Sequence, residues 1–238
     1  GSARRYFHAC RSIRGPAPGG YAAGEVTLAP VVEDFTPASP PQPLVDDEIH
    51  LWFFPQWERT PDAALSAPVR SLLAAYLGQS SASVLIKRGE HGKPRVADAQ
   101  LQFNLSHAGG ALLLGVSRRI ALGIDLESTQ RKTRPAVELA RRFFAPAEAR
   151  ALAALPQSLQ QDTFLRLWCA KESALKAHGR GIGFGLDRFE FTLDATGGVA
   201  PAAGNPWRIV ALAPSPEHVG ALAHAGLVSR VCAFVARN

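Results

Sequence analysis

The chain has 238 residues, of which 47% are apolar and 19% are charged, and its formal net charge is +6. These proportions are ordinary for a soluble globular protein, and no apolar run approaches the roughly 20 residues needed to span a bilayer. We therefore expect one domain or two small ones, with no membrane partner. The positive charge favours an anionic partner such as a nucleotide, a nucleic acid or an acidic protein, although a generally basic surface explains it equally well.

The first 46 residues are rich in proline, glycine and alanine, which is typical of an extended arm or linker. A dense apolar run at residues 48–54 then predicts a buried strand. Helices are predicted over residues 69–77, 139–155 and 162–178, and further strands near residues 83–88, 101–105, 111–117, 120–126, 188–193, 207–212 and 226–236.

The order of these elements predicts an α+β protein with two similar halves. Residues 47–117 and residues 118–238 each give a strand, a helical region and several more strands, after the arm formed by residues 1–46. Few helices are available as crossovers between parallel strands, so mostly antiparallel sheets are expected. We expect the second half to carry the metal site described next.

A short motif at residues 123–127, Gly-Ile-Asp-Leu-Glu, is typical of a β-strand. Positions two apart on a strand share a face, so Asp125 and Glu127 point the same way. Taken alone, the pair also suits two solvated carboxylates at a strand end.

The strongest predicted helix carries Glu172 and Lys176, which are four residues apart and therefore share a face. By itself this spacing is typical of a simple helix ion pair. If the helix meets the strand, Asp125, Glu127 and Glu172 form an all-oxygen pocket suited to a hard cation such as Mg²⁺. Lys176 would then stand one turn away, placed to meet an anion. This is the outline of a phosphoryl-transfer site.

Two upstream segments offer groups that can bind an anion. In residues 88–94, Arg88 and Lys93 accompany two glycines, so side chains and backbone can approach a phosphate, although the sequence also suits an ordinary turn. Ser106 and His107 can donate to a phosphate oxygen or simply cap a strand end. The Gly-x-Ser-x-Gly pattern is absent around Ser106, so a Ser-His-Asp hydrolase is not supported.

Taken together and in order, these motifs resemble those of the 4′-phosphopantetheinyl transferases of the monomeric, surfactin-synthetase-activating type. That family carries Gly-x-Asp-x-Glu and, further on, Trp-x-x-Lys-Glu-x-x-x-Lys, and both occur here without substitution. Phe-Asn-x-Ser-His, Gly-Lys-Pro and an aromatic-plus-Glu segment match as well. The matching motifs lie at residues 92–94, 103–107, 123–127, 142–148 and 168–176.

The resemblance implies transfer of the 4′-phosphopantetheine group of coenzyme A to a serine of an apo carrier protein, acyl or peptidyl, with release of adenosine 3′,5′-bisphosphate. It also implies the family's fold, in which two similar halves are related by pseudo-twofold symmetry. The implied metal is Mg²⁺, with Mn²⁺ as an alternative. A cytoplasmic monomer that does not bind nucleic acid is expected.

The same resemblance gives roles to individual residues. Asp125, Glu127 and Glu172 would hold the metal. Glu172 would also act as the general base for the carrier serine, and Lys176 would stabilise the departing bisphosphate. The expected coenzyme contacts are Arg70, Arg88, Lys93, Ser106 and His107.

Some interpretations stay open at this point. Lys171 can reach phosphate or face solvent, and Trp168 is expected to anchor its helix in the core. Family members usually have a longer stretch, often with basic residues, where only residues 55–68 intervene here. This departure leaves coenzyme contacts from that region, and the contact expected of Arg70, undecided.

Two other functions, and one other type within the same family, have to be separated from this interpretation. A non-catalytic protein that binds coenzyme A or a nucleotide would not need the three acidic residues and Lys176. A nucleic-acid-binding module is suggested by net charge alone, because no aromatic-basic recognition motif is present. The small trimeric fatty-acid-synthase type of the same family fits less well with a chain of this length.

Cysteine usage is the last feature that bears on the environment of the protein. Cys10, Cys169 and Cys232 are few, odd in number and unpatterned. This fits a reducing cytoplasm better than a disulfide framework.

Overall fold

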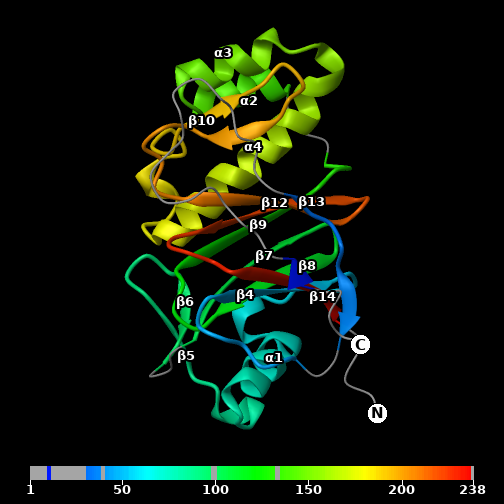
Figure 1. The fold of residues 1–238 in the computed structure, drawn as a ribbon, viewed down its shortest axis with the longest axis vertical. Helices are drawn as coiled ribbons and strands as arrows, with labels where there is room; N and C mark the ends of the chain where they lie inside the picture. Colours follow the sequence, from blue (N-terminus) through cyan, green and yellow to red (C-terminus); the bar gives the residue numbers. More distant parts are fainter. Residues whose placement is uncertain (1–9, 12–30, 39–40, 98–100, 132–134, 237–238) are drawn as a thin grey trace.

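The computed structural model describes residues 10–11, 31–38, 41–97, 101–131 and 135–236. Two sheets lie one above the other in this part of the chain, with helices outside both of them (Figure 1). The first sheet has the order β1-β14-β4-β8-β7, with β3 beside β14. Its strands are β1 (Cys10–Arg11), β3 (Thr36–Ala38), β4 (Glu48–Phe54), β7 (Gln102–Ala108), β8 (Ala111–Ser117) and β14 (Arg230–Ala236).

The second sheet has the order β2-β12-β13-β9. Its strands are β2 (Val31–Val32), β9 (Leu122–Ser128), β12 (Arg208–Ser215) and β13 (His218–His224). Two hairpins stand apart from the sheets: β5 (Ile86–Arg88) with β6 (Pro94–Val96), and β10 (Phe191–Leu193) with β11 (Val199–Pro201). Most strand pairs are antiparallel, as expected, but β14 runs parallel to β3 and β4, and β2 runs parallel to β12.

The helices cover the outer faces of the two sheets (Figure 1). They are α1 (Ala67–Leu77), α2 (Ala136–Phe143), α3 (Pro146–Ala154) and α4 (Gln157–His178), and the short 3₁₀ turns are η1 (Ala63–Leu65), η2 (Ser81–Ser83) and η3 (Ile182–Phe184). Helix α4 packs on β9 and β13, while α1 packs on the first sheet. Gly78 and Gly179 end α1 and α4 in the left-handed conformation that favours glycine.

Three layers of buried apolar side chains hold the two sheets and the helices outside them together. The middle one lies between the sheets and combines side chains of β4 and β8, such as Leu51 and Leu113, with those of β9 and β13, such as Ile124 and Leu222. All four of these side chains are buried. The relative position of the two sheets is therefore fixed by a shared core, and so is any site between them.

The predicted α+β class is confirmed, and the strands at 48–54 and 111–117 occur with the predicted bounds. Strand β13 was missed, although it lies in the centre of the second sheet. Its sequence is rich in glycine, alanine and histidine and poor in the β-branched residues that mark a strand. Small residues suit this position because α4 packs closely over β13.

Hydrogen bonding crosses the division predicted between residues 47–117 and 118–238. Strand β14, at the end of the chain, pairs with β4 of the first half. Strand β2 lies within the predicted arm and pairs with β12 of the second half. The rest of the arm is mostly outside the described residues, and the two-part division stays a prediction.

The expectation of unpaired thiols is wrong for Cys232, which is disulfide-bonded. Cys10 of β1 lies opposite Cys232 of β14 in the sheet register. Cys169 is a buried free thiol on α4. Among the described residues, no helix has both the length and the apolar character needed to cross a membrane.

Candidate active site

The site lies where the edge strand β7 of the first sheet meets the edge strand β9 of the second. Asn104 joins the two strands, because its side-chain Oδ1 accepts a hydrogen bond of 2.7 Å from the backbone N–H of Ile124. On the other side, β9 crosses α4 at Gly123. A Cβ atom at this glycine would stand 2.0 Å from the carbonyl oxygen of Ser173, so only glycine allows this approach. The crossing sets the strand carboxylates beside the helix.

Asp125 is the centre of the site, and its side chain is almost fully buried. Its Oδ1 accepts hydrogen bonds from Lys176 Nζ at 2.7 Å and from Ser106 Oγ at 3.0 Å. The same ammonium group also donates to Ser106 Oγ at 3.0 Å. The other carboxylate oxygen, Oδ2, is buried and has no hydrogen-bond partner among the described residues. An orphaned buried oxygen is costly and points to a missing ligand.

Two more carboxylates lie close to Asp125. Burial raises the pKa of Glu172, and the charge of Asp125 raises it further, while Lys176 opposes both effects. Burial likewise raises the pKa of Glu127, and its ion pair with Arg131 opposes the shift. The charges of Asp125 and Lys176 act on both of these carboxylates, and the metal-holding role of the three acidic residues stays a prediction.

The donor set fits a hard divalent cation such as Mg²⁺ or Mn²⁺, which takes carboxylate oxygens as ligands. The three carboxylates are not closed around one point, because their oxygens are not all within 4.8 Å of one another. The reason is visible in the contacts: Lys176 and Ser106 hold one oxygen of Asp125, and Arg131 holds Glu127. A cation would compete with these partners.

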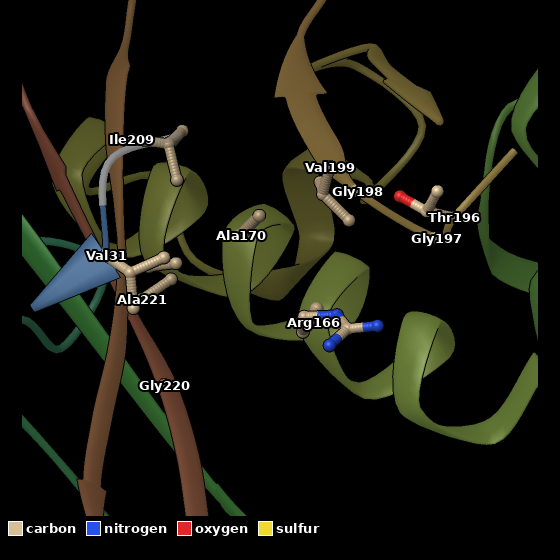
Figure 2. A pocket seen from close by; sticks show the side chains of 11 residues that line it. Val31, Arg166, Ala170, Thr196, Gly197, Gly198, Val199, Ile209, Gly220 and Ala221 are labelled. Atoms are coloured by element: carbon tan, nitrogen blue, oxygen red, sulfur yellow. The ribbon is translucent and has the colours of Figure 1, made fainter. Parts of the chain in front are cut away.

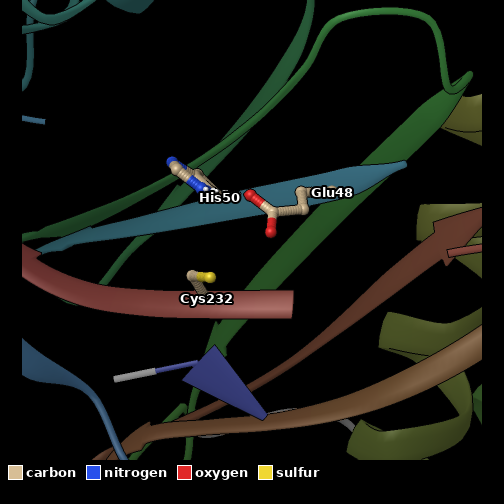
Figure 3. A group of neighbouring side chains, drawn as sticks. All are labelled: Glu48, His50 and Cys232. Carbon is tan, nitrogen blue, oxygen red and sulfur yellow. Dashed lines mark ion pairs between the residues drawn. The ribbon is translucent and has the colours of Figure 1, made fainter. Parts of the chain in front are cut away.

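A second group of ligand-type side chains lies between β4 and β14 and consists of Glu48, His50 and Cys232 (Figure 3). Each member is already engaged. Glu48 pairs with Arg230, His50 shares a hydrogen bond of 2.8 Å with Tyr76, and Cys232 is disulfide-bonded. Burial lowers the pKa of His50 to about 4. This group is a buried polar network rather than a metal site.

A cavity of about 240 Å³ opens beside the acidic residues. One wall is the turn of residues 91–94, and the other is the face of α4 that carries Glu172, Leu175 and Lys176. Asn104 of β7 also lines it. The cavity therefore lies between the basic turn of the first half and Glu172 and Lys176 of the second.

Another cavity of about 240 Å³ lies between α4, β11, β12 and β13 (Figure 2). Its lining is mainly apolar, with Val199, Ile209 and Ala221 facing the space and Arg166 as the charged side chain. No carboxylate is among the residues that line it. We therefore place the chemistry at the first cavity.

The predicted coenzyme-binding cations do not gather at the cavity in this structure. Arg70 donates hydrogen bonds to the carbonyl oxygens of Ser81 and Ala82, and Arg88 pairs with Asp62 at 2.5 Å. Lys93 does line the cavity, but its ammonium group points to backbone carbonyl oxygens. Their contacts with coenzyme stay predictions.

The side chains that surround His107 were not revealed by the sequence patterns. Its ring packs on Trp57, with 4.9 Å between ring centroids. Burial lowers the pKa of His107, and the charges of Arg59 and Lys176 lower it further. Trp57 Nε1 and Thr60 Oγ1 are buried without hydrogen-bond partners among the described residues. The short stretch of residues 55–68 thus contributes the ring of Trp57 and the charge of Arg59 to the surroundings of His107, and only the isolated Arg59 in the sequence hinted at this.

Lys171 neither reaches phosphate nor faces solvent, which were the two options left open. Its fully buried ammonium group pairs with Glu148 at 2.7 Å and donates to the carbonyl oxygens of Leu186 and Phe189. Glu148 in turn accepts from the backbone N–H groups of Ala145 and Phe191. This motif lysine therefore ties α3, α4 and β10 together.

Comparisons with known proteins point to one family. The model of the 4′-phosphopantetheinyl transferase superfamily matches residues 121–223, which include β9 and α4. The 4′-phosphopantetheinyl transferase HetI of a Nostoc species is 33% identical over 223 residues, covering 80% of this chain and 93% of the relative.

Other relatives match over a shorter part of the chain. The 4′-phosphopantetheinyl transferase Sfp of Bacillus subtilis is 34% identical over 134 residues, which are 56% of this chain and 58% of the relative. A mouse L-aminoadipate-semialdehyde dehydrogenase-phosphopantetheinyl transferase is 31% identical over 134 residues, or 52% of this chain and 43% of the relative. Because the similarity to HetI spans nearly that entire protein and the family model covers the acidic strand and helix, this chain belongs to the 4′-phosphopantetheinyl transferase superfamily and is a transferase.

Proposed function

We propose that the three carboxylates, Lys176 and the adjoining cavity carry the transfer of 4′-phosphopantetheine from coenzyme A to a serine of an acyl or peptidyl carrier protein. One observation supports this assignment above the others. Asp125 Oδ2 is buried without a partner, beside two carboxylates with raised pKa and beside an ammonium group. The charges of these buried groups are compensated when a cation and an anionic substrate bind beside them.

Asp125, Glu127 and Glu172 would hold the cation, for which Mg²⁺ is the first choice and Mn²⁺ the second. When bound, the ion supplies positive charge that neutralises the diphosphate of coenzyme A. The remaining chemistry belongs to the side chains of the protein and to the two substrates. Phosphoryl transfer depends mainly on positioning and on charge stabilisation.

Glu172, which lines the cavity, would take the proton of the serine hydroxyl as the general base. The serine oxygen forms a bond to the β-phosphorus, and the bond from that phosphorus to adenosine 3′,5′-bisphosphate breaks. Lys176, which is partly exposed, would neutralise the charge on the departing bisphosphate. The carrier protein supplies the nucleophile, so the enzyme needs none.

Coenzyme would lie in the cavity with its phosphates toward Lys176. His107 and Ser106 remain proposed contacts, and we add Arg59, whose charge acts on His107. Lys93 also lines the cavity, but its ammonium group is engaged by backbone carbonyl oxygens, so the coenzyme contact expected of it from the sequence is not part of this proposal. Arg70 and Arg88 would have to exchange their present partners for a phosphate.

The proposed assembly state is a monomer, and the proposed compartment is the cytoplasm. The first proposal is supported by the origin of the site, since the carboxylates, Lys176 and both cavity walls come from one chain. An acidic carrier surface would suit the net charge of +6. Light scattering on a sizing column tests the monomer directly.

The test of the function is the intact mass of an apo carrier protein after incubation with the enzyme, coenzyme A and Mg²⁺. We expect a gain of one phosphopantetheine arm, lost when EDTA replaces Mg²⁺. Asp125→Asn should abolish the gain, whereas Asp162→Asn, an exposed change on α4, should leave it unchanged. Full activity of the Asp125 variant would refute the assigned site, and no transfer to any of several carrier types would refute the function.

A further inference from the structure

Lys93 sits just before β6, in the first half of the chain, yet its ammonium group ends in the second half. It donates hydrogen bonds to the carbonyl oxygens of Lys176 at 2.7 Å, Leu122 at 2.9 Å and Ala177 at 3.4 Å. An ammonium group has three N–H donors, and these three acceptors use all of them. No donor is left for a phosphate unless one of these bonds is broken.

The three acceptors lie on both sides of the crossing between β9 and α4. Leu122 immediately precedes Gly123, the residue whose missing Cβ lets strand and helix approach. Lys176 and Ala177 belong to the last turn of α4, where carbonyl oxygens lack partners within the helix. A cation at this end is also favoured by the helix dipole. Lys93 therefore satisfies the helix end and joins it to the strand.

The same helix turn carries a residue of the active site. The carbonyl oxygen of Lys176 accepts from Lys93, while its Nζ donates to Asp125 Oδ1 at 2.7 Å and to Ser106 Oγ at 3.0 Å. A shift of the helix end by a fraction of an ångström would move this ammonium group relative to Asp125. Backbone position and catalytic contact are thus linked through one residue.

We propose that Lys93 is a positioning residue, which holds the last turn of α4 against β9 and so fixes Lys176 beside Asp125, rather than a ligand of a coenzyme phosphate. The proposal rests on the proposed roles of Lys176 and Asp125 in the transfer.

The surroundings of Lys93 agree with this role. Burial lowers its pKa to about 8, and no charged group contributes to that shift. A lysine placed to meet an anion would be expected close to other cations, as His107 is to Arg59 and Lys176. Lys93 instead has neutral carbonyl oxygens around it.

The experiment compares Lys93→Met, which keeps an unbranched side chain only one atom shorter but removes its donors, with Lys93→Arg, which restores them. Lys87→Met is the matched control, because Lys87 is exposed on the neighbouring strand β5. For each variant we would measure kcat, the dissociation constant of coenzyme A by calorimetry, and amide hydrogen exchange over residues 175–181. Circular dichroism and Tm would establish that each variant is folded.

For Lys93→Met we expect kcat to fall about 10- to 100-fold, since small displacements near a reacting centre cost this much. The affinity for coenzyme A should stay within about threefold of the wild type, and hydrogen exchange should quicken at the end of α4. Lys93→Arg should recover most of kcat, and Lys87→Met should match the wild type.

Two results would overturn the proposal. One is a weakening of coenzyme binding by tenfold or more with kcat retained at saturating coenzyme, which would make Lys93 a ligand. The other is an unchanged kcat in folded Lys93→Met. If Lys93→Met does not fold, folded Lys93→Arg decides: near wild-type kcat with protected residues 175–181 supports the proposal, and a lasting loss of coenzyme affinity alone overturns it.

Lys176→Met and Asp125→Asn separate this failure from that of the proposed function. Activity retained in these two variants would refute the proposed site itself. Activity lost in them but kept in Lys93→Met would refute only the role of Lys93.

Discussion

At the scale of single residues, the two oxygens of Asp125 have different surroundings. Oδ1 has two hydrogen-bond donors, whereas Oδ2 is buried with none among the described residues. A buried group that lacks a partner costs about 1–3 kcal/mol. The site is therefore destabilised in the absence of ligands, as expected where function and stability compete.

Glu172 allows a direct test of whether the buried carboxylates of the site weaken folding. Burial and Asp125 raise its pKa in the folded protein, so the ionised side chain weakens folding at neutral pH. We predict that Glu172→Gln abolishes transfer and raises Tm in EDTA at neutral pH, where each 1 kcal/mol corresponds to about 2–4 °C. The gain over the wild type should shrink as the pH falls through the raised pKa, because the wild-type carboxyl group then becomes neutral as well.

Differential scanning calorimetry at several pH values would check this, with Glu138→Gln on the exposed face of α2 as the control. A Glu172→Gln variant with unchanged or lower Tm in EDTA would show that the buried charge is not a cost to the fold.

Arg131 forms an ion pair with Glu127 and should compete with a metal ion for this carboxylate. The arginine side chain is about half exposed, so the pair is worth no more than about 1 kcal/mol. We predict that Arg131→Gln lowers the Mg²⁺ concentration for half-maximal activity by about two- to fivefold, which corresponds to that energy. Titration of activity with Mg²⁺ measures it. A higher Mg²⁺ requirement would mean that Arg131 helps to hold the substrate instead.

At the scale of elements, several motif residues act by packing rather than by chemistry. Asn104 joins β7 to β9, Gly123 allows β9 to cross α4, and Lys171 with Glu148 connects α4 to α3 and β10. Trp168, as expected, packs in the aromatic cluster of α2 and α4. The two main motifs therefore build the junction of strand and helix as well as its reacting groups.

Gly123→Ala tests this junction. The added Cβ would meet backbone atoms of Ser173 and Ala177 at 2.0 and 2.3 Å, and backbone cannot move aside as a side chain can. We predict a loss of stability at or above the upper end of the roughly 1–3 kcal/mol typical of overpacking, measured by urea unfolding. Gly183→Ala is the control, because nothing lies within 4 Å of a Cβ there. Equal stability of the two variants would contradict the close crossing.

Short-range sequence patterns predicted which residues share a face of a strand or helix. They did not predict the partners of the long charged side chains. Asp125 and Glu127 share a face because a strand alternates, and Glu172 and Lys176 do so because a helix repeats. Lys93, Arg88 and Lys171 find partners distant in the chain, which spacing does not reveal. Strand β13 was missed because its small residues have low strand propensity. They suit the close packing of α4 over this strand instead.

At the scale of the whole molecule, the order of strands in space departs from the order along the chain. Strand β14 lies in the sheet of the first half, and β2 lies in the sheet of the second. Between the sheets, side chains from both halves form one buried layer. The active site uses the edge of each sheet, so its geometry depends on the alignment of both.

This arrangement predicts that the halves unfold together. Neither sheet can open without exposing the shared layer, and the loss of β14 or β2 would break hydrogen bonds in the sheet of the other half. The four tryptophans report on both halves: Trp52 and Trp57 pack against the first sheet, and Trp168 and Trp207 pack on the second. With 5-fluorotryptophan and the disulfide of Cys232 intact, all four ¹⁹F signals should convert at one urea concentration. Separate midpoints for the two pairs would show that each half folds as its own unit, and the alignment of the two edges would then have to come from the bound substrates.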